Sequence, residues 1–304
     1  MISVIITAYK EAGTISKAIN CIANPKYSGI HWDFELIQIS PDDETLEEGL
    51  KEANSLGLGN KFIQMKDPQK GKPFALSMAS KKAKGEILVL TDGDVYLGES
   101  AIPSILKHFS DINIGGVTGR PISLDSRTTF WGYISHLLTD SAHHKRMNTL
   151  GKGGFFPMSG YLFAINNSLN DFTIPNNLLS EDGYISYFVA NSGKQIVYEP
   201  NALVYVKFPK NFKDYLNQKV RSLGGYMQLE RLGVTKKFKQ SRSIFNEIKY
   251  AVFALKYAKT FKEFVWSLIF FPIRLYTWIV IFFKRILLKK ELPENGWERI
   301  LSTK

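Results

Sequence analysis

The residues of this sequence best suited to chemistry are two aspartates, Asp92 and Asp94, which are separated by Gly93. They follow an uncharged apolar segment, residues 87–90, which is typical of a strand buried on both faces. Two carboxylates at positions i and i+2 lie on one side of an extended chain, and the intervening glycine permits a tight turn. Carboxylate oxygens are suitable ligands for Mg²⁺ or Mn²⁺, which complete their shells with water and substrate phosphates. The pattern therefore predicts a divalent-metal site for a phosphate-bearing substrate.

The two common phosphate-binding loops are absent from the sequence. No G-x-G-x-x-G follows the first predicted strand, and no G-x-x-x-x-G-K-[ST] occurs anywhere in the chain. A bound phosphate must therefore be held in another way, and a metal ion on Asp92 and Asp94 would do so.

The segments that must position these aspartates alternate between strand and helix patterns. This alternation predicts right-handed crossovers and an α/β fold with a mostly parallel, Rossmann-like sheet flanked by helices. Ligands of such sheets bind at the carboxyl edge of the strands, where the two aspartates fall. The expected strands are residues 2–7, 34–39, 61–65, 87–90, 116–119, 159–165, 195–198 and 202–206. The expected helices are residues 14–22, a helix ending near 54, 71–84 with Gly85 at C′, 99–109, a helix from Ser180 as N-cap to about 193, and one carrying 218–222. Residues 127–149 are expected to be less regular.

Charge is distributed unevenly along the 304 residues. Residues 201–304 hold 21 of the 39 Lys and Arg residues but only 7 of the 28 Asp and Glu residues, whereas the first two thirds are slightly acidic. This split favours a near-neutral catalytic domain with a basic membrane-facing tail over a protein that coats nucleic acid, so no nucleic-acid partner is expected. Cys21 is the single cysteine, which excludes an intrachain disulfide and a zinc-cysteine site.

The last third also contains two segments that indicate membrane contact. Residues 236–262 follow a basic, amphipathic helical pattern, and residues 264–283 are apolar apart from Ser267, Pro272, Arg274 and Thr277. The second segment is long enough to span a bilayer, but a central arginine is costly there and a proline would kink the helix. A span, a helix lying in the interface and a buried core helix all stay open. We expect membrane association through residues 236–290 and, with no signal peptide before the first strand, at the cytoplasmic face of the cell membrane.

Five further segments resemble the inverting family-2 glycosyltransferases, which have the GT-A fold. They are SVIITAYKEAG at 3–13, GKPFAL at 71–76, TDGD at 91–94, SEDG at 180–183 and QKVRS at 218–222. The last one resembles the QxxRW motif of membrane-bound polysaccharide synthases, with Ser222 in place of the tryptophan, which puts processive synthesis in doubt. The resemblance implies a GT-A catalytic domain at residues 1–230 and a membrane-associated helical region at residues 231–304.

The resemblance also implies roles for individual residues. Asp182 would be the catalytic base, and a metal ion with Lys72 and Arg221 would neutralise the leaving diphosphate. The implied metal ligands are Asp94 and Asp92. The implied acceptor-side residues are Ser159, Gly160 and Glu181. The implied donor-binding residues are Thr7, Ala8, Tyr9, Glu11, Asp42, Lys72, Asp92, Gln218 and Arg221.

The function that the resemblance implies is sugar transfer with inversion from a nucleotide sugar, a UDP-sugar before a GDP-sugar, to a lipid-linked or glycan acceptor. Mg²⁺ or Mn²⁺ would be the cofactor. One alternative is a nucleotidyltransferase, which shares the sheet and the metal carboxylates but normally carries a Gly-rich basic signature where this chain has AYKEAG. Another is a non-enzymatic basic protein that binds membrane or nucleic acid through the last hundred residues.

Overall fold

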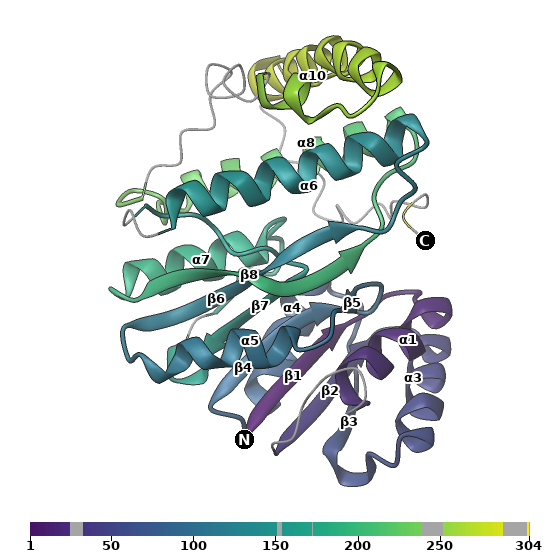
Figure 1. Cartoon of the computed structure of the whole chain (residues 1–304). Coiled ribbons are helices and arrows are strands. Elements are labelled where there is room, and N and C mark those ends of the chain that lie inside the picture. The colour runs from purple at the N-terminus through teal and green to yellow at the C-terminus, as the bar shows by residue number, and fades with distance from the viewer. Residues whose placement is uncertain (25–32, 151–153, 172, 239–251, 288–302, 304) are drawn as a thin grey trace.

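A computed structural model describes residues 1–24, 33–150, 154–171, 173–238, 252–287 and 303. Its centre is an eight-stranded sheet of order β3-β2-β1-β4-β7-β6-β8-β5 (Figure 1). The strands are β1 (Ile2–Thr7), β2 (Phe34–Ser40), β3 (Phe62–Lys66), β4 (Ile87–Asp92), β5 (Tyr96–Leu97), β6 (Ile114–Ser123), β7 (Leu162–Asn166) and β8 (Gln195–Val206). The helices are α1 (Ala12–Ala23), α3 (Asp43–Ser55), α4 (Lys72–Lys82), α5 (Ala101–Leu106), α6 (Phe130–Thr149), α7 (Glu181–Asn191), α8 (Phe212–Arg231) and α10 (Phe261–Leu287).

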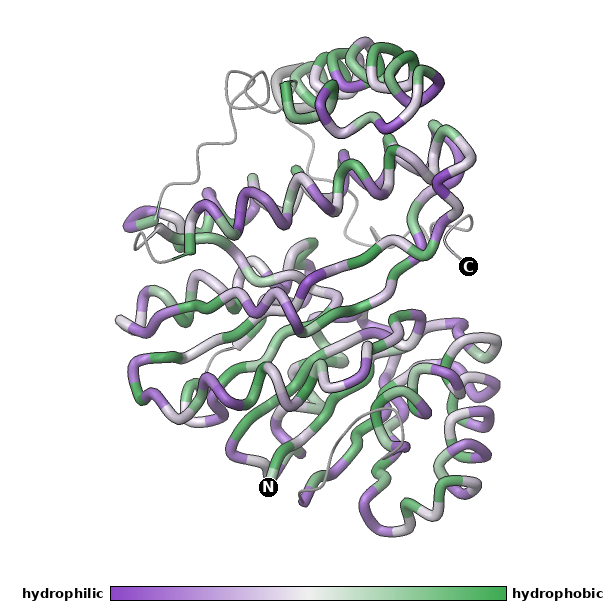
Figure 2. The backbone as a smooth tube through the Cα atoms, in the orientation of Figure 1, coloured by the Kyte–Doolittle hydropathy of each residue, from purple (hydrophilic) through white to green (hydrophobic). Residues whose placement is uncertain are grey.

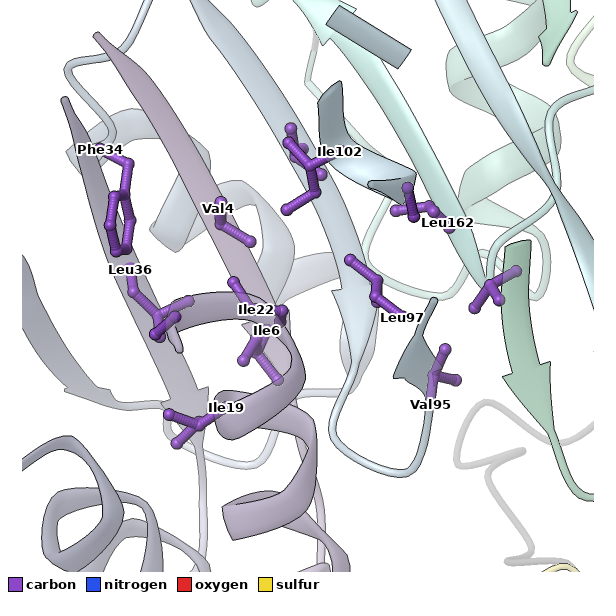
Figure 3. Close-up of a cluster of buried hydrophobic side chains, with 14 of the residues drawn as sticks. Val4, Ile6, Ile19, Ile22, Phe34, Leu36, Val95, Leu97, Ile102 and Leu162 are labelled. Atoms are coloured by element: carbon purple, nitrogen blue, oxygen red, sulfur yellow. The ribbon is translucent and has the colours of Figure 1, made fainter. Parts of the chain in front are cut away.

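The four strands β1 to β4 are parallel, and their carboxyl ends meet at one edge. The apolar residues of β1, β2 and most of β4 are buried on both faces of the sheet, whereas those of the edge strand β3 are half-buried. On one face, Val4 and Ile6 of β1 pack in a cluster with Ile19 and Ile22 of α1 (Figure 3). On the other face, Leu76 of α4 packs in the same cluster as residues of α7. This packing fixes α1 and α4 on opposite faces, so the loops that precede both helices reach the carboxyl edge.

The second half of the sheet is mixed. Strand β7 runs antiparallel to both β4 and β6, and β5 runs antiparallel to β8, whereas β6 and β8 are parallel. The prediction of a mostly parallel α/β sheet is confirmed, but residues 195–198 and 202–206 form one strand, β8, with a register shift opposite residues 118–120. Residues 127–149 are also more regular than expected, because α6 continues unbroken from Phe130 to Thr149.

Gly85 does not end α4 in the way its position predicted. The helix ends at Lys82 with an extended C-cap at Ala83. Gly85 instead lies against β1, where its N–H donates to Ser3 Oγ at 2.7 Å and an added Cβ would lie 2.3 Å from the Ser3 nitrogen. The glycine is therefore required by the close approach of two chain segments.

Helices α6, α8 and α10 form a separate layer beyond the sheet (Figure 1). Tyr133 and Leu137 of α6, Tyr215 of α8 and Phe270 of α10 share one buried cluster. The basic segment predicted at 236–262 lies partly outside the described residues, which omit 239–251, and residues 252–257 are helical. Helix α8 ends at Arg231, beside the predicted domain boundary at 230, which stays a prediction.

Candidate active site

A cavity of about 960 Å³ opens at the carboxyl ends of the parallel strands. Residues at or after the ends of β1 to β4 line it, together with the first residue of α4, the segment before α7 and one side of α8. The lining also includes Tyr161, Val206, Lys207 and Thr303. Most of the residues that were expected to bind the donor or the metal line this cavity. They are Thr7, Ala8, Tyr9, Glu11, Lys72, Asp92, Asp94, Gln218 and Arg221.

Asp92 and Asp94 have different surroundings within this cavity. Asp92 is the last residue of β4, and its Oδ1 accepts a hydrogen bond from Thr7 Oγ1 at 2.8 Å, since the two residues are direct neighbours in the β1–β4 register. The chain then turns at Gly93, where an added Cβ would lie 2.5 Å from Glu11 Oε2. A larger residue at position 93 would displace the loop after β1. Asp94 lies beyond this turn and lines the cavity.

Lys72 connects Asp92 to the helix that carries the candidate base. Its Nζ lies 2.7 Å from Asp92 Oδ1 and 2.9 Å from Glu181 Oε1. Burial alone would lower the pKa of Lys72, but the two carboxylates outweigh it and raise that pKa above its ordinary value. Lys72 was expected to neutralise the diphosphate, yet its charge is already balanced within the protein. Glu181, expected on the acceptor side, is buried as a partner of this ammonium.

Asp182 is held by three hydrogen bonds. Its Oδ2 accepts from Gly160 N–H at 3.0 Å, and its Oδ1 accepts from Ser180 Oγ at 2.8 Å and from Gly183 N–H at 2.7 Å. Ser180 occupies the N-cap position of α7, but its hydroxyl serves Asp182 and makes no capping bond. An added Cβ at Gly160 would lie 3.1 Å from Asp182 Oδ2, so glycine permits this close approach.

Tyr161 is a cavity residue that the sequence did not single out. Its carbonyl accepts from Thr91 Oγ1 at 2.8 Å, which fixes the chain beside β4. Burial raises the pKa of Tyr161 to about 12; Asp94 and, more weakly, Asp92 and Asp182 act in the same direction, and Arg221 opposes them. The phenol therefore stays protonated at neutral pH. Asp182 does not itself line the cavity, but it accepts the Gly160 N–H directly before the cavity residue Tyr161, so it lies close behind the wall.

Residues that follow β1 and β3 form another part of the cavity wall. Tyr9 and Pro68 line it, and the Tyr9 hydroxyl accepts from Gln69 Nε2 at 3.1 Å. Asp67 lies beside them, buried, with its Oδ1 accepting from the Gln69 N–H at 2.7 Å. Burial raises the pKa of Asp67. Asp67, Pro68 and Gln69 follow β3, so the rule that ligands bind at the carboxyl edge could have identified them from the sequence.

Asp42, expected to contact the nucleoside, does not line the cavity. Its Oδ1 accepts from the Thr45 N–H and hydroxyl and caps α3, while its Oδ2 accepts from the Lys10 N–H at 2.7 Å and from Ser40 Oγ at 3.0 Å. The carboxylate thus ties the loop after β1, where Lys10 has a φ of 54°, to the end of β2. Ser159, Gly160 and Glu181 also lie outside the cavity wall, close to Asp182.

The donor set of this site fits a hard divalent cation bound together with a substrate. Among the residues that the structure describes, no group of three or more His, Cys, Asp or Glu side chains could hold a metal alone. Asp94 faces the cavity, and Asp92 has Oδ1 engaged by Thr7 and Lys72. One or two carboxylates with phosphate oxygens and water form a shell that Mg²⁺ commonly adopts.

Comparison with known sequences identifies relatives of this chain. A family model described as "Glycosyltransferase like family 2" matches residues 1–225. The poly-beta-1,6-N-acetyl-D-glucosamine synthase of Staphylococcus aureus strain MSSA476 is 25% identical over 238 residues, which are 76% of this chain and 56% of that protein. The poly(ribitol-phosphate) beta-N-acetylglucosaminyltransferase TarS of S. aureus strain Mu50 is 27% identical over 127 residues, 40% of this chain and 22% of that protein. The chain thus spans about half the length of the first of these relatives.

Comparison with solved structures confirms the fold. The mannosyltransferase PcManGT from Pyrobaculum calidifontis, solved with GDP-Man and Mn²⁺, aligns with a TM-score of 0.59 at 17% identity, covering 97% of this chain and 82% of that one. GalNAc-T7, solved with UDP, GalNAc and Mn²⁺, aligns with a TM-score of 0.51 at 18% identity, covering 68% of this chain and 43% of that one.

Proposed function

The chain belongs to the family described as glycosyltransferase like family 2, and we propose that it transfers a sugar, with inversion, from a nucleotide sugar to a lipid-linked or glycan acceptor. One observation carries this proposal: beside one cavity, Lys72 joins Asp92 at the sheet edge to Glu181, the residue next to the candidate base Asp182 on α7. A sugar bound in this cavity would lie between the site for its leaving diphosphate and the candidate base.

The donor would lie with its nucleoside near Tyr9 and its diphosphate near Asp94 and Arg221, all of which line the cavity. A ring stacked on Tyr9 would have polar groups of Asp67 and Gln69 beside it. We propose a UDP-sugar as the first donor to test. The names of the two S. aureus relatives make an N-acetylhexosamine the first sugar, and the mannosyltransferase solved with GDP-Man makes GDP-mannose the second donor.

Asp94, with Asp92, would hold Mg²⁺ or Mn²⁺ against the diphosphate. A bound cation of this kind supplies charge neutralisation for the leaving phosphate oxygens. Arg221 of α8 adds a permanent positive charge to the same cavity, and the N-terminus of α4, at Gly71 and Lys72, adds its partial positive charge. Lys72 would keep Asp92 in place, and its predicted contact with the diphosphate stays a prediction.

Asp182 would remove the proton from the acceptor hydroxyl as the sugar is displaced. A carboxylate offers about four acceptor positions, and protein donors occupy three on Asp182. The remaining position is available to the acceptor hydroxyl, while the three donors hold the carboxylate in a fixed orientation. The acceptor would approach past Gly160 and Tyr161. Membrane association at the cytoplasmic face would bring a lipid-linked acceptor to this side.

The products of the reaction test the proposal against its main rival. Incubation with radiolabelled UDP-N-acetylglucosamine or GDP-mannose, Mn²⁺ and a lipid or glycan acceptor mixture is expected to release a nucleoside diphosphate and to label the acceptor. Release of pyrophosphate from a sugar phosphate and a nucleoside triphosphate would instead identify a nucleotidyltransferase. Salt-sensitive nucleic-acid binding without either product would favour the non-enzymatic basic protein.

A further inference from the structure

Helix α10 turns several polar side chains toward the protein and apolar side chains outward, which is the reverse of an ordinary surface helix of a soluble protein. The residues that face the protein at heptad spacing are Glu263, Ser267, Phe270, Arg274 and Thr277, of which Arg274 is half-buried and the others are buried. The large apolar residues that are exposed away from the protein are Phe261, Phe264, Leu268, Ile269, Leu275, Tyr276, Ile279, Phe282 and Phe283. A helix with an apolar outer side indicates an apolar medium around it.

The buried polar side chains attach α10 to the catalytic domain. Glu263 accepts from Arg127 Nε at 2.6 Å and from the second guanidinium nitrogen at 3.0 Å. Ser267 Oγ lies 2.6 Å from the Tyr133 hydroxyl, and Arg274 donates to the Tyr215 hydroxyl at 3.3 Å. From Glu263 to Arg274 these contacts run over about 16 Å of helix, at 1.5 Å per residue. Helix α10 therefore lies along the surface formed by α6 and α8 (Figure 1).

This attachment decides between the orientations that the sequence left open. Helix α10 is the helix of the described chain that is long and apolar enough to cross a membrane. If it did so while attached along its length, α8 with exposed Lys213 would be carried to the depth of the lipid chains, where charges are costly. Half of the 18 large exposed apolar residues in the described chain belong to α10, so a core helix is also excluded.

Charge near the start of α10 indicates what the apolar side contacts. Lys256, Lys259 and Lys262 are exposed around its first turn, and the last third of the chain carries three times as many basic as acidic residues. The apolar surface continues onto α8, because the rings of Phe212 and Tyr276 lie 5.7 Å apart. Figure 2 shows the apolar run along α10 beyond the more polar α6. Apolar residues bordered by lysines fit the interface of an anionic lipid bilayer.

We propose that α10 docks the enzyme on an anionic membrane surface, lying parallel to it with this apolar side in the interface and without crossing the bilayer. This orientation rests on the membrane association in the proposed function, but it does not depend on the proposed chemistry. It also orients the molecule, because α6 and α8 then lie between the membrane and the sheet.

Depth measurements on the full-length chain test this orientation. In a Cys21→Ser background, single cysteines at Leu268, Leu275 and Phe282 carry an environment-sensitive fluorophore, and Leu50→Cys, exposed on α3, serves as the control. With vesicles of phosphatidylcholine and phosphatidylglycerol, lipids brominated at different depths are expected to quench all three α10 labels at one shallow depth and to leave Leu50→Cys unaffected. A label at 275 that is deepest, with 268 and 282 near opposite surfaces, would overturn the proposal in favour of a span.

Vesicle binding tests whether the exposed apolar side of α10 contacts lipid. Leu268→Glu/Ile279→Glu is expected to lower sedimentation with these vesicles at least tenfold, whereas Leu50→Glu leaves it unchanged, with both variants folded by circular dichroism. Binding should also fall with added salt and with phosphatidylcholine alone. If the double variant still binds vesicles, or if the wild type ignores vesicles and forms a dimer that the double variant breaks, the proposal is wrong. The release of nucleoside diphosphate from the donor is measured without lipid, so that it tests the proposed sugar transfer independently of membrane binding.

Discussion

Lys72 and Glu181 form a buried ion pair with 2.9 Å between Nζ and Oε1, and the same Nζ lies 2.7 Å from Asp92. The first helical turn of α4 thus joins the end of β4 to the start of α7. Asp92 and the start of α7, which carries the candidate base, are in this way held together, although they are far apart in the sequence. Lys72 is accordingly a positioning residue in this account.

Replacing Lys72 by methionine should destabilise the fold and lower turnover together. The change leaves Asp92 and Glu181 without their shared cation, and breaking a buried charge pair costs about 3–5 kcal/mol. Urea unfolding and kcat measure the two effects. Lys51→Met is the matched control, because its pair with Glu48 is exposed and its loss should change stability very little. Lys72→Met/Glu181→Gln should recover part of the lost stability, and no recovery would contradict the shared-cation account.

Asp182→Asn should abolish sugar transfer while donor binding is retained. The amide can occupy the same place but cannot take the proton of the acceptor hydroxyl. In the proposed function, donor binding depends on Asp94 and Arg221, which line the cavity, whereas Asp182 does not. Transfer kinetics and calorimetric titration of the nucleotide sugar separate the two properties. An active Asp182→Asn enzyme would end the assignment of the base.

Gly160→Ala should lower kcat with little effect on donor affinity. An alanine Cβ would lie 3.1 Å from Asp182 Oδ2, closer than ordinary van der Waals contact, so the carboxylate must move by a few tenths of an ångström. Gly13→Ala is the control, because an added Cβ there meets no atom within 4 Å. Equal kcat values for the two variants would show that the position of this carboxylate does not limit the reaction.

The attachment of α10 should weaken in acid. The hydrogen bonds from Arg127 lower the pKa of Glu263 to about 2 from an ordinary value of 4.5. A lowered folded-state pKa contributes stability that is present above pH 4.5 and is lost as the pH falls toward 2. The difference in Tm between wild type and Glu263→Gln should therefore be largest near pH 7 and shrink below pH 4.5. Exposed Glu47→Gln supplies the control, and a difference independent of pH would contradict the ion pair.

The first half of the fold could be read from the sequence because its signals are local. Uncharged β-branched runs such as residues 2–7 form buried parallel strands, and strand β1 matches its predicted range. The pairing of β7 antiparallel to β4 depends on contacts distant in the sequence, so no local pattern indicated it. Helix α6 was missed as a regular element because its apolar residues are confined to the half that packs on Tyr215 and Phe270, while the other half is polar.

The candidate site was predictable where residue type and motif position coincide. The carboxylates at 92 and 94 reach the cavity as expected, and Arg221 and Gln218 reach it from α8. Partners could not be predicted, since a lysine near a phosphate and a lysine between two carboxylates look alike in sequence. The structure shows the second arrangement for Lys72. The roles of these residues in catalysis stay predictions.

The central claim is that a divalent cation on Asp94 and Asp92 binds the donor diphosphate. Isothermal titration of a UDP-sugar into the full-length protein, with Mn²⁺ and then with EDTA, measures this directly beside Asp94→Asn and the exposed control Asp111→Asn. The account predicts that Mn²⁺ strengthens binding to wild type and to Asp111→Asn, and that Asp94→Asn loses this response. Donor binding that is equally tight with EDTA, or a full Mn²⁺ response in Asp94→Asn, would contradict it.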